Sequence, residues 1–223
     1  MNLLFIGNSL SAYNGNVGNH VRQLAAAASP AMACETDGFF VSGQCLQTLW
    51  TKHLAHNKIK TGRFDRVVLQ EDLPETSVAA FCTYAREFSA LAESKGALPL
   101  LFMAWNYRRL SWISMDEIAR AHSAVAQELG IQVAPVGLAW SKSIASRPLL
   151  DLYCPDREHP SIYGTYLAAV VIYAAIYNAD PSGLGYRPSG ISAEEALFLQ
   201  RIGWETAREY PQAQPTGIEK TGN

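Results

Sequence analysis

The sequence predicts an α/β protein, a three-layer α/β/α sandwich built on a flavodoxin-like, five-stranded parallel sheet. Short apolar runs alternate along the chain with longer amphipathic segments, which is the pattern of parallel strands joined by crossover helices. The chain has 223 residues, of which 48% are hydrophobic and 17% charged, enough for one domain with a full core. We therefore expect a single domain over residues 1–210 and a flexible C-terminal tail over 211–223.

Five apolar runs are the expected strands. The run RVVLQ is the clearest of them, because it is short and its centre is apolar and β-branched. The first run, LLFI, stands almost at the start of the chain and leads directly into a turn. In chain order the expected strands cover residues 3–6, 35–42, 66–70, 98–105 and 131–137.

The expected helices combine apolar residues at helical spacing with recognisable ends. Ser114 with Glu117 and Ser192 with Glu195 have the spacing of capping boxes, in which each end of the pair satisfies a free backbone amide. Gly130 stands where a left-handed residue commonly ends a helix. In chain order the expected helices cover residues 16–28, 47–55, 78–96, 114–130, 161–177 and 191–210.

Composition argues against several classes of partner. The net charge is -2 and no dense Lys/Arg run occurs, so we expect no nucleic-acid partner. The longest apolar run, at 166–177, is too short to span a bilayer, and the first residues lack the features of a signal peptide, so a cytoplasmic protein without a membrane partner is expected. The four cysteines form no CxxC pair and are expected to be reduced thiols rather than disulfides or metal ligands.

A serine follows the first expected strand, in the segment GNSL. Ligands of parallel α/β sheets bind at the carboxyl ends of the strands, so Ser9 presents its hydroxyl at the expected crevice. Its own N–H would be a free donor at a helix start, well placed for an oxyanion. A serine in such a turn is, by itself, more often a loop residue or a helix cap. A phosphate-binding turn is disfavoured, because neither glycine-rich phosphate motif is present.

A serine nucleophile needs a base, and the best candidate lies in the segment DREHPS. Asp156 and His159 are three residues apart in a loop that precedes a helix. This spacing lets the carboxylate hold one ring nitrogen while the other faces the serine. An Asp/His pair at this spacing is usually no more than two solvated loop residues. Its place after the last strand is more informative, because that loop can return to the end of the first strand.

These segments together resemble the SGNH hydrolases, the GDSL-type esterases and lipases. The resemblance covers roughly residues 1–178, and the joint order of its motifs is far more specific than any one of them. The usual GDS reads GNS here, as in a bacterial subgroup of poorly defined substrate. The matching segments are GNS at 7–9, SG at 42–43, VVLQE at 67–71, PVGLAW at 135–140 and HPSIYGTYLAA at 159–169.

The resemblance implies a role for each matched residue. Ser9 is similar to the family nucleophile, whose N–H also binds the oxyanion. Gly43 matches the glycine whose N–H is a second oxyanion donor. Asp156 and His159 match the orienting carboxylate and the base.

The third family block departs from the pattern. Most members place GxND after the third strand, with the asparagine as third oxyanion donor, whereas this chain reads QEDLPE. Gln70 either supplies an amide of the same chemistry or is an inward polar residue at the strand end. Asn106 is another candidate donor, with a loop cap as its alternative. Glu71 and Asp72 either tune the pKa of His159 or are solvated loop charges. Loss of one donor typically costs about 3 kcal/mol of transition-state stabilisation.

Residues after the fourth strand extend the candidate site. Trp105 and Trp140 either line an acyl or sugar pocket or belong to the core, where aromatic residues are more common. Arg108 and Arg109 either attract an anionic group of the substrate or face water.

The expected function is that of a serine esterase acting on a small-molecule ester through an acyl-enzyme on Ser9, with no metal and no organic cofactor. Small esters, including O-acetyl groups on carbohydrate, are the substrates that the resemblance implies. Two alternatives stay open: an acyltransferase that uses the same triad, and a catalytically silent small-molecule-binding domain on the SGNH fold.

Overall fold

The computed structural model describes residues 1–212 of the chain, so most of the predicted tail lies outside the described residues. Its centre is a five-stranded sheet in the order β2-β1-β3-β4-β5. Each neighbouring pair runs parallel. The strands are β1 (Asn2–Gly7), β2 (Glu35–Phe40), β3 (Arg66–Gln70), β4 (Leu98–Phe102) and β5 (Gln132–Ala134).

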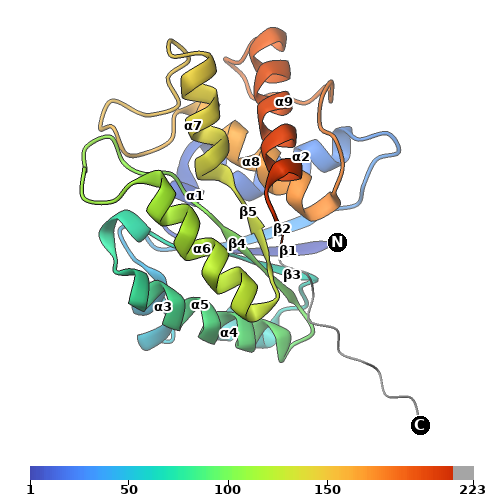
Figure 1. Cartoon of the computed structure of the whole chain (residues 1–223). Helices are drawn as coiled ribbons and strands as arrows, with labels where there is room; N and C mark the ends of the chain where they lie inside the picture. Colours follow the sequence, from blue (N-terminus) through green and yellow to red (C-terminus); the bar gives the residue numbers. More distant parts are fainter. Residues whose placement is uncertain (213–223) are drawn as a thin grey trace.

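Helices cover both faces of this sheet (Figure 1). The two hydrophobic clusters, one on each face, contain residues of different helices. The predicted three-layer α/β/α sandwich is thereby confirmed. One layer consists of α2 (Val17–Ala27), α7 (Val136–Ser146), α8 (Ile162–Tyr177) and α9 (Ala193–Glu209), and the other of α3 (Leu46–Thr51), α4 (His56–Thr61), α5 (Val78–Glu93) and α6 (Met115–Leu129).

The alternation of side chains along β1 explains why the strands read as continuous apolar runs. Leu3 and Phe5 belong to the cluster under α2 and α8, whereas Leu4 and Ile6 belong to the cluster under α3 and α5. Successive strand residues point to opposite faces, and both faces of a parallel sheet are covered. Every position must therefore be apolar, and all four side chains are at most 1% exposed.

The helix ends confirm the predicted signals. Both capping boxes form, at Ser114 with Glu117 and at Ser192 with Glu195. Gly130 ends α6 in the left-handed region, with φ of 66°. The conformation there is readily adopted by glycine because it lacks a Cβ atom.

Several segments differ from the sequence prediction. The fourth strand was expected over residues 98–105, but β4 ends at Phe102. The last strand is shorter than expected, and α7 begins at Val136, within the apolar run that was predicted to be all strand. Pro135 lacks a backbone N–H and caps α7, while a Cβ on Gly137 would lie 2.4 Å from the carbonyl oxygen of Ala104. The predicted helix at 47–55 corresponds to α3, which ends at Thr51, and the short helix α4 that follows was not predicted. His53, between them, has a left-handed φ of 53° that breaks the helix.

The first residues of the predicted tail are placed by the sheet. The side chain of Gln212 accepts a hydrogen bond from the Val133 N–H at 3.0 Å and donates one to the Val133 carbonyl at 2.9 Å.

Within the described range, no helix combines the length and the apolar character needed to cross a membrane. All four cysteines are free thiols.

Candidate active site

Ser9 lies where the sequence predicted, at the carboxyl end of β1 and at the start of the short helix α1 (Ser9–Ala12). Neighbouring strands β1 and β3 are the point at which the strand order reverses, which is where open α/β sheets bind ligands. Asn8 caps α1, because its Oδ1 accepts a hydrogen bond from the Leu10 N–H at 3.0 Å. The cap fixes the turn that presents the Ser9 hydroxyl.

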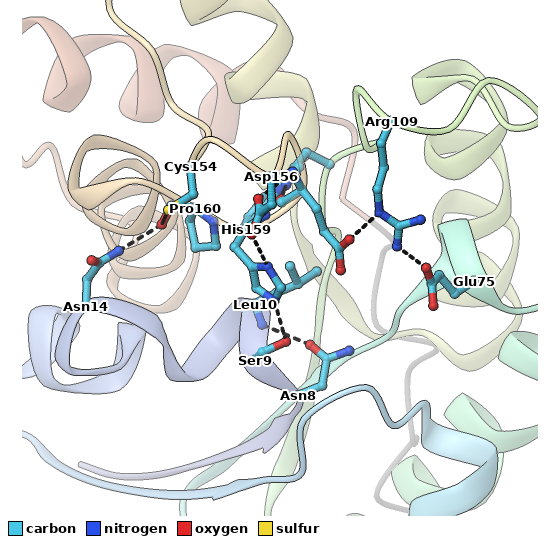
Figure 2. A network of polar contacts seen from close by, with 12 residues as sticks. Asn8, Ser9, Leu10, Asn14, Glu75, Arg109, Cys154, Asp156, His159 and Pro160 are labelled. Carbon is cyan, nitrogen blue, oxygen red and sulfur yellow. Dashed lines mark hydrogen bonds and ion pairs between the residues drawn. The ribbon is translucent and has the colours of Figure 1, made fainter.

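The three predicted triad residues meet in one hydrogen-bonded chain (Figure 2). The Ser9 Oγ lies 2.9 Å from the His159 Nε2, although the two residues are 150 positions apart. On the other side of the ring, the His159 Nδ1 lies 2.8 Å from the Asp156 Oδ2. A carboxylate can only accept, so Nδ1 carries the proton and Nε2 is free to accept from the serine hydroxyl. This arrangement of tautomer and orientation is the one a serine nucleophile requires.

Asp156 is held by the backbone of its own loop. Its Oδ1 accepts hydrogen bonds from the N–H of Glu158 at 3.0 Å and of His159 at 2.9 Å. Burial works to raise the pKa of Asp156, but these bonds and the His159 side chain outweigh it and lower that pKa below its ordinary value. Asp156 therefore stays ionised opposite the imidazole.

The segment after Ser9 also contacts His159 and its loop, which sequence reasoning missed. The ring of Tyr13 stacks on that of His159, with centroids 4.3 Å apart and planes 13° from parallel. The Asn14 Nδ2 donates to the Pro160 carbonyl at 2.9 Å (Figure 2). It also donates to the Thr165 hydroxyl at 2.8 Å. Residues 9–14 thus carry the serine and also hold the histidine loop. No motif in the sequence signals these two contacts.

Two backbone amides are candidate oxyanion donors. Ser9 is the first residue of α1 and has no intrahelical acceptor for its N–H. Gly43 lies in the exposed turn after β2 with φ of 65°. A Cβ at Gly43 would meet no atom within 4 Å, so the backbone conformation, and not local crowding, favours glycine here. Among residues 1–212 neither amide donates to another backbone carbonyl.

The side chain of Gln70 is hydrogen-bonded to the turn that carries Ser9. Its Oε1 accepts hydrogen bonds from the Asn8 N–H at 3.0 Å and the Ser11 hydroxyl at 3.1 Å. Its Nε2 is buried and has no hydrogen-bond partner within the described residues. Asn106, the other candidate, is half-buried, and its carbonyl accepts from the Tyr153 hydroxyl at 2.7 Å. A donor role for either amide stays a prediction.

Replacing Gln70 by alanine tests that role. If Gln70 donates to the oxyanion, kcat for p-nitrophenyl acetate falls with little change in KM. The lost acceptor also leaves the buried Asn8 N–H unpaired, which should lower the free energy of unfolding by about 1–3 kcal/mol. Urea denaturation and steady-state kinetics measure the two effects, with the exposed Gln47→Ala as control. An unchanged kcat would show that Gln70 is not an oxyanion donor and serves only to hold the turn that carries Ser9.

Of the two alternatives for Trp105 and Trp140, a pocket lining or the core, their burial favours the core. They are 0% and 1% exposed, and their rings stack with centroids 3.8 Å apart. The Trp105 Nε1 donates to the Glu158 carbonyl at 2.9 Å. The two rings therefore lie beneath the histidine loop and support it from inside the protein.

Glu71 and Asp72 are buried, so neither is a solvated loop charge. Asp72 accepts hydrogen bonds from the Asn8 Nδ2 at 2.9 Å and the Tyr107 hydroxyl at 2.5 Å. Burial raises the pKa of Asp72 to about 6, against the lowering effect of these two bonds. Through Asn8, Asp72 supports the turn that carries Ser9.

The two arginines are paired with carboxylates. The Arg108 Nη1 lies 3.2 Å from the Asp151 Oδ1, and Arg109 forms ion pairs with both Glu75 and Glu158. Sequence reasoning offered an anionic substrate or water as their partners and missed these acidic residues. Within residues 1–212, no cluster of three or more His, Cys, Asp or Glu side chains could hold a metal ion.

Comparisons with known proteins agree with this architecture. No family profile matches the sequence, and no curated protein sequence matches it. Among solved structures, a DUF4886 family protein from Bacteroides uniformis has a TM-score of 0.78 at 15% identity, covering 97% of this chain and 98% of its own.

Two further solved structures are described as hydrolases. A candidate SGNH hydrolase from Slackia heliotrinireducens has a TM-score of 0.65 at 26% identity and covers 78% of this chain and 97% of its own. An acetylxylan esterase from Geobacillus stearothermophilus has a TM-score of 0.59 at 16% identity, with 83% and 94% covered. The chain therefore has the fold of the SGNH hydrolase superfamily, which confirms the family resemblance that its motifs indicated.

Proposed function

We propose that this protein is a serine esterase that hydrolyses a small carboxylic ester through an acyl-enzyme on Ser9. The observation that carries the proposal is the unbroken chain of hydrogen bonds from Asp156 through His159 to the Ser9 hydroxyl. A serine hydroxyl is a weak nucleophile unless an adjacent base takes its proton. The likeness to SGNH hydrolases and an acetylxylan esterase supports the same class of reaction.

The first half of the reaction forms the acyl-enzyme. His159 Nε2 takes the hydroxyl proton as the Ser9 Oγ attacks the carbonyl carbon of the ester. The carbonyl oxygen becomes an oxyanion, which the N–H groups of Ser9 and Gly43 bind. When the C–O bond to the alcohol breaks, His159 returns its proton to the leaving oxygen. Ionised Asp156 stabilises the imidazolium between these two transfers.

Water completes the reaction by the same steps in reverse. His159 takes a proton from water, whose oxygen attacks the acyl carbon, and then returns that proton to the Ser9 Oγ as the ester bond breaks. An alcohol in place of water would make the protein an acyltransferase. Analysis of the products with and without an added alcohol separates the two reactions. O-acetyl groups on carbohydrate are the substrate class that we propose to test first, because a structural neighbour is an acetylxylan esterase.

Labelling with an alkyl fluorophosphonate tests the proposal directly. We expect one covalent adduct, mapped by mass spectrometry to the peptide that contains Ser9, because the reagent requires an activated serine. Ser9→Ala should remain unlabelled, and the exposed Ser146→Ala should label like the wild type. If wild-type protein stays unlabelled while a control esterase reacts, the enzyme proposal fails and the silent binding domain is favoured. An adduct on another serine would refute the assignment of Ser9.

A further inference from the structure

The catalytic carboxylate and the base lie on one irregular loop between α7 and α8. Within this loop the Cys154 N–H donates to the His159 carbonyl at 2.7 Å, and Tyr153 and Pro160 form an isolated antiparallel β-bridge. Arg157 adopts a left-handed φ of 64°, which is uncommon for a non-glycine residue. A loop without a helix or strand of its own needs external contacts to hold two catalytic side chains in register.

Those contacts come largely from the segment that follows β4. The Trp105 Nε1 donates to the Glu158 carbonyl, and the Arg108 N–H donates to the Arg157 carbonyl, both at 2.9 Å. The Arg109 guanidinium pairs with the Glu158 carboxylate through its Nε (Figure 2). Glu158, which directly precedes His159, is therefore held at both its backbone carbonyl and its side chain.

Arg109 also connects the loop to the segment that follows β3. Its Nη2 pairs with Glu75, which ends the short 3-10 turn after β3, so one guanidinium joins Glu75 and Glu158. The side chain of Glu158 is only 18% exposed. Without Arg109, the carboxylates of Glu75 and Glu158 would face each other with no cation between them, and their repulsion would displace the catalytic loop.

We propose that Arg109 is a positioning residue, which orients Asp156 and His159 by holding Glu158; this role rests on the proposed esterase function. The Glu158 N–H donates to Asp156 Oδ1, so a shift of Glu158 moves the carboxylate that orients the imidazole. Displacements of about 1 Å can cost about a hundredfold in rate. Partly exposed ion pairs, in contrast, contribute at most about 1 kcal/mol to stability. Arg109 therefore matters more for catalysis than for folding.

A double-mutant cycle between Arg109 and Glu158 tests the role. For p-nitrophenyl acetate, a neutral ester, Arg109→Ala should lower kcat about tenfold with KM nearly unchanged. Glu158→Ala should have a similar effect, and the double variant should be no slower than the worse single one. Arg109→Lys keeps the charge but not the planar fork and should recover only part of the rate. Effects that multiply in the double variant would overturn the proposal.

Arg86→Ala is the matched control, because Arg86 also pairs with a carboxylate, Glu128, through its Nε and Nη2. That pair joins α5 to α6, so its loss should leave kcat unchanged. If Arg109 instead binds an anionic substrate, Arg109→Ala will raise KM for the p-nitrophenyl monoester of succinic acid and spare kcat for the acetate. That result would also overturn the positioning role.

Hydrogen exchange separates this proposal from the esterase proposal. Arg109→Ala should speed the exchange of amides in residues 154–160, whereas Arg86→Ala should not. This readout needs no turnover, so it tests the positioning role of Arg109 independently of activity. If wild-type protein neither reacts with fluorophosphonate nor hydrolyses esters, only the esterase proposal fails. If amide exchange in residues 154–160 is unchanged in Arg109→Ala, the positioning role is refuted, whatever the activity of the variant.

Discussion

Ser9→Ala is expected to lower kcat for p-nitrophenyl acetate at least about a hundredfold, and His159→Ala to lower it by a similar factor. The two side chains act as one unit, because the 2.9 Å bond between Ser9 Oγ and His159 Nε2 is the path of the transferred proton. The double variant should therefore be about as slow as either single one, and not slower by the product of the two factors.

The controls are residues of the same types outside the site. Ser146→Ala, near the end of α7, and His53→Ala, between α3 and α4, should both keep the wild-type kcat. Unfolding curves in urea show whether each variant is folded, so that a loss of activity can be distinguished from a loss of structure. If Ser9→Ala and His159→Ala both keep wild-type rates, the triad assignment is wrong.

The fold could be predicted because both faces of the sheet are buried. Leu3, Leu4, Phe5 and Ile6 all had to be apolar, and such a run is visible in a sequence without any knowledge of its neighbours. The site followed from a rule of topology, since parallel strands bring their carboxyl ends to one edge. The start of α7 could not be predicted in the same way, because PVGLAW is apolar whether it forms a strand or a buried helix.

The support of the site depends on partners far away in the sequence. Arg109 meets Glu75 and Glu158, which lie 34 and 49 positions away, and no local spacing indicates either contact. The hydrogen bonds of Asp72 likewise join it to Tyr107 and Asn8, which lie 35 and 64 positions away in the sequence. The residues of the candidate triad could therefore be found from motifs, whereas the residues that hold them in place required the tertiary structure.

Glu71 is a buried acid whose titration should shape the stability of the whole protein. It directly follows β3 and is 1% exposed, and its Oε1 accepts hydrogen bonds from the N–H groups of Asp72 at 2.7 Å and Leu46 at 3.4 Å. Its Oε2 has no partner among the described residues. Burial, together with the charge of Asp72, raises the pKa of Glu71 from 4.5 to about 7, against the lowering effect of the two backbone bonds.

A raised acid pKa makes the folded state bind a proton that the unfolded state has lost. The stabilising effect of that proton is fully present below pH 4.5 and is lost as pH rises through about 7. The shift corresponds to about 3 kcal/mol. His122 acts in the opposite sense, because burial lowers its pKa from 6.5 to about 4, so its stability contribution is lost as pH falls between these values.

Glu71→Gln should remove the pH dependence of stability that is due to Glu71 and leave the one that is due to His122. Glutamine keeps an acceptor for both backbone amides and is neutral at every pH, so the variant should be more stable than wild type at pH 8 by up to about 3 kcal/mol. The difference should shrink toward pH 4.5, where wild-type Glu71 is itself neutral. Below pH 6.5 the variant should lose stability more steeply than wild type, because the titration of His122 is no longer opposed by that of Glu71.

Urea denaturation at a series of pH values from 4.5 to 8 measures this, with the exposed Glu87→Gln on α5 as the matched control. The stability curve of this control should run parallel to that of wild type across the range, because the substitution leaves Glu71 and His122 in place. If Glu71→Gln also runs parallel to wild type, Glu71 is already ionised in the folded protein. Its charge would then be balanced by the two backbone amides on Oε1, and the cost of burying it would not appear as a dependence on pH.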